Sequence, residues 1–175
     1  MPIIVETGGI VPDANSYASV AEADARHSLS TSADTWENFD LPVKEQRLVT
    51  ATRRLDALFD WVGTPYRADQ PLGFPRRNLY DMTGRPVYMK LVPVAVRNAT
   101  IDLALWLPED VAASGATGDV IEEITLGPIG IKMAVPDTAA ATVQPYVPAD
   151  IIMMLRHFGQ YVGSNSGGGV GRLIR

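Results

Sequence analysis

Two segments of this sequence carry apolar residues at the spacing of an α-helix, and this periodicity constrains the fold strongly. The first runs from about residue 42 to residue 61, and its apolar positions include Val43, Leu48, Ala51, Leu55, Leu58 and Phe59. The second lies between Pro93 and Pro108, and its apolar positions include Val96, Ala99, Leu103, Ala104 and Leu107. Such a stripe is stable only when another element buries it, so the sequence predicts packed helices in a mainly α protein.

Two further helices are indicated by a start signal and by a third apolar stripe. Ser19 and Glu22 have the spacing of a capping box, which predicts a helix from about residue 20 to residue 29. Apolar residues from Ile151 to Phe158 predict a last helix over about 149–161. The expected architecture is a small bundle of about four helices.

Two other segments do not fit a helix. Residues 63–92 contain four prolines and three glycines, which predicts a long ordered loop inserted into the bundle. In residues 119–135, β-branched and apolar residues surround Gly127 and Pro128, a turn pair, so we predict a β-hairpin there.

The last thirteen residues, 163–175, join a glycine and serine tether to a short apolar and basic tip. The tip residues are Val170, Arg172, Leu173, Ile174 and Arg175. Glycine-rich chain buries too little apolar surface to hold itself in place, and this one would reach roughly 40 Å when extended. We therefore predict one helical domain over residues 1–162 and a flexible C-terminal arm whose tip docks on a partner. Ile3, Ile4 and Val5 are strand-like and suggest a second extended arm at the N-terminus.

The composition argues against an enzyme. Cysteine is absent, the two histidines lack metal-ligand spacing, and no nucleophile-elbow or phosphate-loop motif occurs, so we expect no catalytic residue, cofactor or metal. Asp24 and His27 lie one helical turn apart, but a surface pair explains them better than a metal site.

No apolar run approaches the roughly 20 residues that span a bilayer, and we expect a cytoplasmic protein with no membrane partner. A net charge of −5 disfavours a protein built mainly to grip phosphates.

One cluster of basic and aromatic residues leaves two interpretations open. Its basic members are Arg53, Arg54, Arg76 and Arg77, and its aromatic members include Trp61, Tyr66, Phe74 and Tyr80. Arginines interleaved with aromatic rings can neutralise phosphates and stack bases, which makes these four arginines candidate nucleic-acid contacts. Alternatively the aromatic residues anchor the long loop and the arginines pair with nearby aspartates. We favour the second interpretation, because a loop of this length needs buried anchors.

Several short motifs in this order resemble a tailed-phage and prophage family. They are VETGGIVPDANSYASV at residues 5–20, RLD at 54–56, QPLGFPR at 70–76, YDMTGRP at 80–86, VPVAVR at 92–97, LGPI at 126–129 and RLIR at 172–175. Members are often labelled putative DnaT-like single-stranded DNA-binding proteins, and their usual setting is among head-to-tail connector genes. Phe74 stands where the family often has Trp, and Arg26 where it tends to have an aromatic residue.

The resemblance implies either a connector (adaptor) protein or a DnaT-like single-stranded DNA-binding protein. The acidic charge favours the connector, because double-stranded DNA must pass through it without sticking. We therefore expect a non-enzymatic ring below the portal that also contacts tail or neck proteins. The resemblance implies twelve copies in that ring, matching the portal, with heterologous contacts between them. Such a protein would be made in the host bacterial cytoplasm and would reside in the neck of the virion.

Overall fold

The computed structural model describes residues 2–81, 83–107, 123–126, 129–132 and 147–162. These residues belong to two compact units. The larger unit holds the described residues up to Leu107 and those from Val147 onward, and the smaller lies within 108–146.

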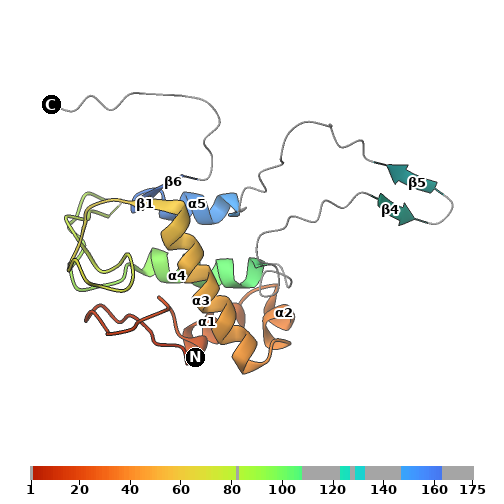
Figure 1. The fold of residues 1–175 in the computed structure, drawn as a ribbon, viewed down its shortest axis with the longest axis horizontal. Helices are drawn as coiled ribbons and strands as arrows, with labels where there is room; N and C mark the ends of the chain where they lie inside the picture. The colour runs from red at the N-terminus through yellow and green to blue at the C-terminus, as the bar shows by residue number, and fades with distance from the viewer. Residues whose placement is uncertain (1, 82, 108–122, 127–128, 133–146, 163–175) are drawn as a thin grey trace. The chain divides into compact units, whose positions relative to one another are not determined.

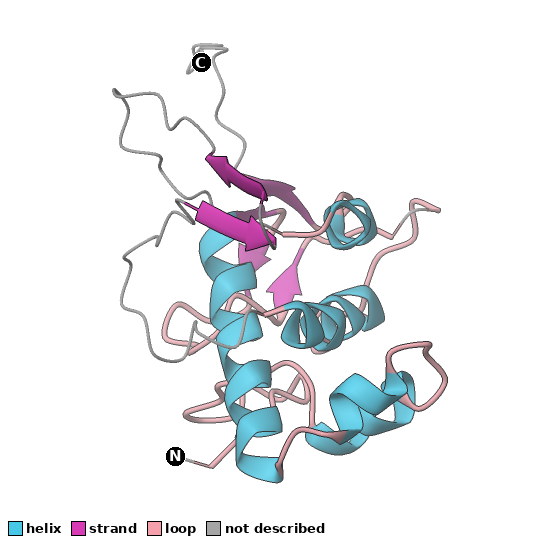
Figure 2. Cartoon of the chain, turned by 90° about the vertical axis from the view of Figure 1, so that its right-hand side faces the viewer, coloured by secondary structure: helices cyan, strands magenta, loops and turns pink. Residues whose placement is uncertain are grey.

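The larger unit is built mainly from helices (Figures 1 and 2). Its helices are α1 (Val20–His27), α2 (Ala33–Glu37), α3 (Leu41–Leu58), α4 (Val94–Trp106) and α5 (Ala149–Leu155). Helix α3 packs along α4, α5 packs against α4, and α1 contacts both α3 and α4. This confirms the expectation of a mostly helical fold. The described part has one helix more than the four expected, because the five-residue α2 is too short to show a periodic stripe.

The local start signals act as predicted. At the start of α1 the Ser19 side chain accepts a 3.2 Å hydrogen bond from the Glu22 amide, and the Glu22 carboxylate accepts a 2.9 Å bond from the Ser19 amide. Pro42 lies in the first turn of α3, and Pro93 is the cap residue of α4. Proline suits these positions because the first amides of a helix have no intrahelical partner.

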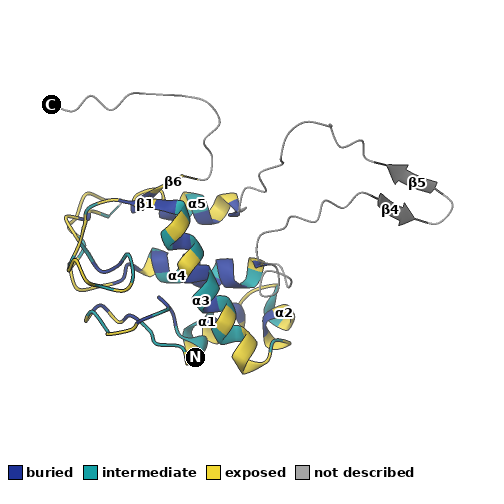
Figure 3. Ribbon diagram, in the orientation of Figure 1, coloured by how far each residue is buried: buried dark blue, intermediate teal, exposed yellow. Residues whose placement is uncertain are grey.

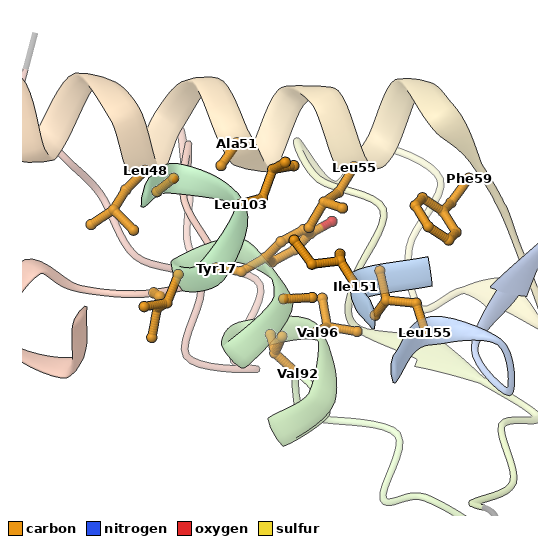
Figure 4. Close-up of a cluster of buried hydrophobic side chains, with 14 of the residues drawn as sticks. Tyr17, Leu48, Ala51, Leu55, Phe59, Val92, Val96, Leu103, Ile151 and Leu155 are labelled. Atoms are coloured by element: carbon orange, nitrogen blue, oxygen red, sulfur yellow. The ribbon is translucent and has the colours of Figure 1, made fainter. Parts of the chain in front are cut away.

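The core lies where α3, α4 and α5 meet, and Figure 4 shows its side chains pointing toward one another. Fully buried members include Leu48, Leu55, Val96, Leu103, Ile151 and Leu155. Each comes from one of the three predicted apolar stripes, and Figure 3 shows buried segments along these helices. Burying each such side chain contributes about 1.5–3 kcal/mol before conformational entropy is counted. The stripes therefore supply most of the apolar contact that holds the helices together.

Two predicted helices end earlier than expected. Strand β1 (Phe59–Trp61) follows α3 directly, and it pairs antiparallel with β6 (Gly159–Tyr161), which follows α5. The apolar spacing continues through Phe59 and Phe158, so helical periodicity alone cannot reveal that the chain becomes extended. Gly159 lies opposite Trp61, and a β-carbon there would come within 2.7 Å of the indole. This close approach explains the glycine.

The described residues of the long loop, 63–81 and 83–92, are ordered, as predicted, and contain little regular structure. Strand β2 (Thr64–Pro65) pairs with β3 (Arg76–Arg77), and Tyr80 forms an isolated bridge with Pro86. The expectation of an N-terminal arm is wrong for the described residues. The Ile4 carbonyl accepts hydrogen bonds from the amides of Asn15 (2.8 Å) and Ser16 (3.2 Å), so the segment folds back on itself.

The described residues of the smaller unit form the predicted β-hairpin. Strands β4 (Glu123–Leu126) and β5 (Ile129–Lys132) are antiparallel, with Ile124 opposite Ile131 and Leu126 opposite Ile129. The predicted turn pair and the predicted C-terminal arm lie outside the described residues. Within the described part, no helix is long and apolar enough to cross a membrane.

Candidate functional site

The long loop is anchored by a half-buried carboxylate near the end of α3. Asp56 accepts hydrogen bonds from the Tyr17 hydroxyl (2.6 Å), the Trp61 indole N–H (2.9 Å) and the Gly73 amide (3.0 Å). Burial raises the pKa of Asp56, and it raises the pKa of Tyr17 well above the ordinary value. Trp61 is 8% exposed and Phe74 is 0% exposed. These two aromatic residues are therefore loop anchors, as predicted, and their rings are not free to stack bases.

Arg76 is used to hold the same loop. Its guanidinium donates to the carbonyl oxygens of Trp61 (3.1 Å), Val62 (2.8 Å), Gly63 (2.8 Å) and Gly73 (3.1 Å). Burial lowers the pKa of this half-buried arginine. A guanidinium that satisfies four backbone carbonyls has little donor capacity left for a phosphate. The predicted pairing of loop arginines with aspartates occurs at Arg67, which forms a salt bridge of 2.8 Å with Asp69.

Arg77 points to a different surface from Arg76. Its guanidinium carbon lies 4.4 Å from the centre of the Tyr66 ring, and the Lys90 ammonium lies 5.9 Å from the same centre. Both cations are exposed. We call Tyr66, Arg77 and Lys90 the Tyr66 cluster. This cluster combines two positive charges with one aromatic ring.

The two other candidate arginines lie on α3. Arg53 is exposed and lines a shallow groove of about 290 Å³ together with Asn15 and Glu45, whereas Arg54 is half-buried. Arg53 and Arg76 are thus in different surroundings, one exposed on α3 and one among backbone carbonyls. The four arginines predicted from sequence therefore have separate local roles in the described structure.

A larger groove, which the sequence did not indicate, runs between α1 and α4. Its volume is about 730 Å³, and its apolar lining includes Leu29, Val94, Leu105 and Trp106. Leu29 is 92% exposed and Trp106 is 61% exposed. The only sequence signal for this groove was Trp106 itself, a large aromatic residue next to the predicted helix stripe. We call this feature the α1–α4 groove.

Ion pairs line the groove and tie its two helices together. Arg26 binds Asp102 through two hydrogen bonds of 2.7 Å, and Arg97 binds Glu22 at 2.8 Å. The hydrogen bond to Asp102 raises the pKa of Arg26. Burial acts to raise the pKa of Glu22, but hydrogen bonds from Ser19 and the Arg97 charge outweigh it and lower that pKa. The Arg26–Asp102 ion pair thus joins α1 to α4.

The Asp24 and His27 side chains have other partners. Asp24 accepts hydrogen bonds from the Trp36 indole (2.7 Å) and from Lys44 (2.9 Å). His27 is buried, with Nε2 3.3 Å from the Ile101 carbonyl oxygen, and burial lowers its pKa. Among the described residues no group of three or more potential metal ligands occurs. Asp24 therefore joins α1 to Trp36 and Lys44, and His27 packs in the interior.

The predicted docking residues of the arm lie outside the described residues. They are Val170, Arg172, Leu173, Ile174 and Arg175. Their docking role remains a prediction.

Comparison with known proteins identifies a family. The family model described as "Putative DnaT-like ssDNA binding protein" matches residues 1–175, the whole chain. No curated protein and no solved structure matches.

Proposed function

We propose that this chain, which belongs to the putative DnaT-like ssDNA-binding protein family, has a structural role in protein assembly. In this proposal it is a head-to-tail connector (adaptor) of a tailed phage. Copies form a ring below the portal protein, link it to tail or neck proteins and let double-stranded DNA pass. The protein is made in the host bacterial cytoplasm and resides in the virion.

The α1–α4 groove is the observation that carries this proposal. Leu29 and Trp106 expose large apolar surfaces in a groove whose walls are fixed by the ion pairs of Arg26 and Arg97. An exposed tryptophan beside other exposed apolar side chains, in a groove that is otherwise polar, is typical of protein interfaces. A binding role between proteins therefore explains this surface better than catalysis.

The charge of the chain supports the same proposal. A net charge of −5 would repel DNA from the wall of a channel and so prevent adhesion during passage. The predicted arm adds apolar and basic residues that suit docking on another protein.

A direct test mixes the purified full-length protein with the portal of its own phage. Negative-stain images should show a ring of additional density on the portal. Leu173→Asp combined with Ile174→Asp should remove that density, because the two charges would enter an apolar contact. Absence of complex formation by the unaltered protein would overturn the connector role.

The Tyr66 cluster favours a second candidate function, binding of single-stranded DNA. Arg77 and Lys90 are exposed beside an aromatic ring, and the family description names this ligand. Base stacking and phosphate neutralisation need this combination. The decisive measurement is the affinity for single-stranded oligonucleotides at two salt concentrations.

A further inference from the structure

We propose that two surfaces of this protein bind each other in successive copies, so that the chain associates head to tail. The long loop of one copy, residues 63–92, docks on the Trp106 end of the α1–α4 groove of the next copy. This inference rests on the proposed assembly function and names the contact between its copies. It requires no portal, so it can be tested separately.

The acceptor surface is the apolar part of the groove near the C-terminal end of α4. Trp106 and Leu29 line the same groove and are 61% and 92% exposed. A tryptophan in such a place buries a large area when a partner covers it, and interface hot spots are enriched in tryptophan. The surface is therefore suited to receive apolar and aromatic side chains.

The donor surface is the tip of the long loop. Tyr80 and Tyr88 are 58% and 63% exposed, and Met89 and Leu91 are also exposed. The Asp56 and Arg76 hydrogen bonds hold the first part of the loop. Nearer these side chains, the Leu79 carbonyl accepts a 2.9 Å hydrogen bond from the Val87 amide. A rigid loop loses little conformational entropy on binding, which favours its use as a docking element.

The charges of the two surfaces are complementary. Residues 63–92 contain five basic and two acidic residues, which gives the loop a net charge of +3. The whole chain has a net charge of −5, so the rest of the chain carries −8. The groove is lined by the carboxylates of Glu22, Asp102 and Asp150. The first two already pair with Arg97 and Arg26 of the same groove, which leaves the charge of Asp150 for a partner. Asp150, Arg77 and Lys90 take part in none of the four salt bridges found among the described residues. These three charges are therefore available to pair between copies.

The two surfaces lie toward opposite ends of one helix. The loop leads into α4 at Val94, and Trp106 is the last residue of α4. Thirteen helical residues separate these ends by about 20 Å. In Figure 1 the loop lies at the left end of α4, and α2 lies toward its other end. Because donor and acceptor are different surfaces, the contact is heterologous, and repetition produces a ring or a filament.

The test uses two full-length variants with complementary defects. Trp106→Ala removes the acceptor, and Arg77→Glu combined with Lys90→Glu removes the donor. Sedimentation velocity at about 100 µM protein and low salt should show the unaltered chain associating. Each variant alone should associate at least roughly tenfold more weakly. An equal mixture of the two variants should form a dimer, because each still carries one intact surface.

Matched controls separate this contact from general effects. Met153→Ala removes an exposed side chain outside the groove, and Arg53→Glu combined with Arg156→Glu makes the same change in charge elsewhere. Both should associate like the unaltered chain. If Trp106→Ala unfolds the protein, Leu29→Asp replaces it as the acceptor variant.

Several outcomes would overturn the proposal. They are an unaltered chain that stays monomeric, a Trp106→Ala variant that associates normally, and a mixture of variants that stays monomeric. None of these outcomes tests whether the protein binds its portal. A chain that binds its portal but fails these tests would keep the connector role and lose only this contact.

Discussion

Tyr17 donates a 2.6 Å hydrogen bond to Asp56, and this contact joins the segment before α1 to the end of α3. The Tyr17 hydroxyl also accepts a 3.2 Å bond from the Phe74 amide, and Asp56 accepts one from the Gly73 amide. This pair therefore fixes three parts of the chain that are distant in sequence. The position of the long loop depends on it.

The first prediction concerns Phe74, whose ring packs edge-on against Trp61 and Tyr17. Phe74→Ala should lower the free energy of unfolding by about 3 kcal/mol or more, because it leaves a cavity under the loop. Urea unfolding followed by circular dichroism measures this loss. Unchanged stability together with weaker oligonucleotide binding would instead support a base-stacking role.

The second prediction concerns pH and Asp56. Burial raises the pKa of Asp56 above its ordinary value of 3.8, although hydrogen bonds from Tyr17, Gly73 and Trp61 act in the opposite direction. The folded state therefore binds this proton more tightly than the unfolded state does. The resulting stability is fully present below the unfolded pKa and is lost as pH rises through the folded pKa.

Asp56→Asn isolates this effect, because asparagine does not titrate. Its amide would face the Gly73 N–H, so we expect a loss of about 1–3 kcal/mol. The loss should be largest at low pH and shrink as pH rises. Glu22→Gln is the opposite control, because the pKa of Glu22 is lowered in the folded state and its contribution disappears as pH falls. Urea unfolding at several pH values measures both trends, and a pH-independent difference for Asp56→Asn would contradict the first.

The third prediction concerns the C-terminal arm. Deleting residues 163–175 should leave the thermal unfolding transition nearly unchanged while abolishing assembly with the portal, because the predicted contacts of the arm are all with a partner. Calorimetry and negative-stain imaging of the same preparation check the two parts. Loss of both folding and assembly would assign the segment to the core.

The fourth prediction concerns nucleic acid. At physiological salt the isolated protein should bind single-stranded oligonucleotides no more tightly than about 10⁻⁴ M, as expected for weak non-specific binding. Fluorescence anisotropy at two salt concentrations measures this affinity. Micromolar binding that weakens steeply with salt would establish the second candidate function instead.

Arginine variants then locate the contact. Replacing Arg53, Arg54, Arg76 and Arg77 by alanine tests the set indicated by the sequence, but losing Arg76 also removes four bonds to loop carbonyls. Arg77→Ala combined with Lys90→Ala is the cleaner variant, because both side chains are exposed. Weaker oligonucleotide binding at unchanged stability in this double variant would assign the contact to the Tyr66 cluster.

Local signals predicted much of the helical unit. The Ser19 and Glu22 capping box and the prolines at positions 42 and 93 depend only on neighbouring residues, and the structure confirms all three helix starts. The ends were harder to predict. Phe59 continues the apolar spacing of α3, yet its strand is created by pairing with Tyr161, which is distant in sequence.

The surfaces depend on long-range contacts and were predicted less well. The sequence grouped Arg76 with Arg77, but adjacent residues of a strand point to opposite sides, and only Arg77 reaches Tyr66. The α1–α4 groove depends on how α1 packs on α4. The Arg26–Asp102 pair that contributes to this packing joins positions 76 residues apart, beyond any local pattern.

Residues 108–146 enter and leave the helical unit at two buried residues, Leu107 (4% exposed) and Val147 (3% exposed). With both ends held, a change in the length of this segment should alter the free energy of unfolding only weakly, since loop-closure entropy grows slowly with length. Insertions, deletions and exchanges between the two anchors should therefore leave the helices intact.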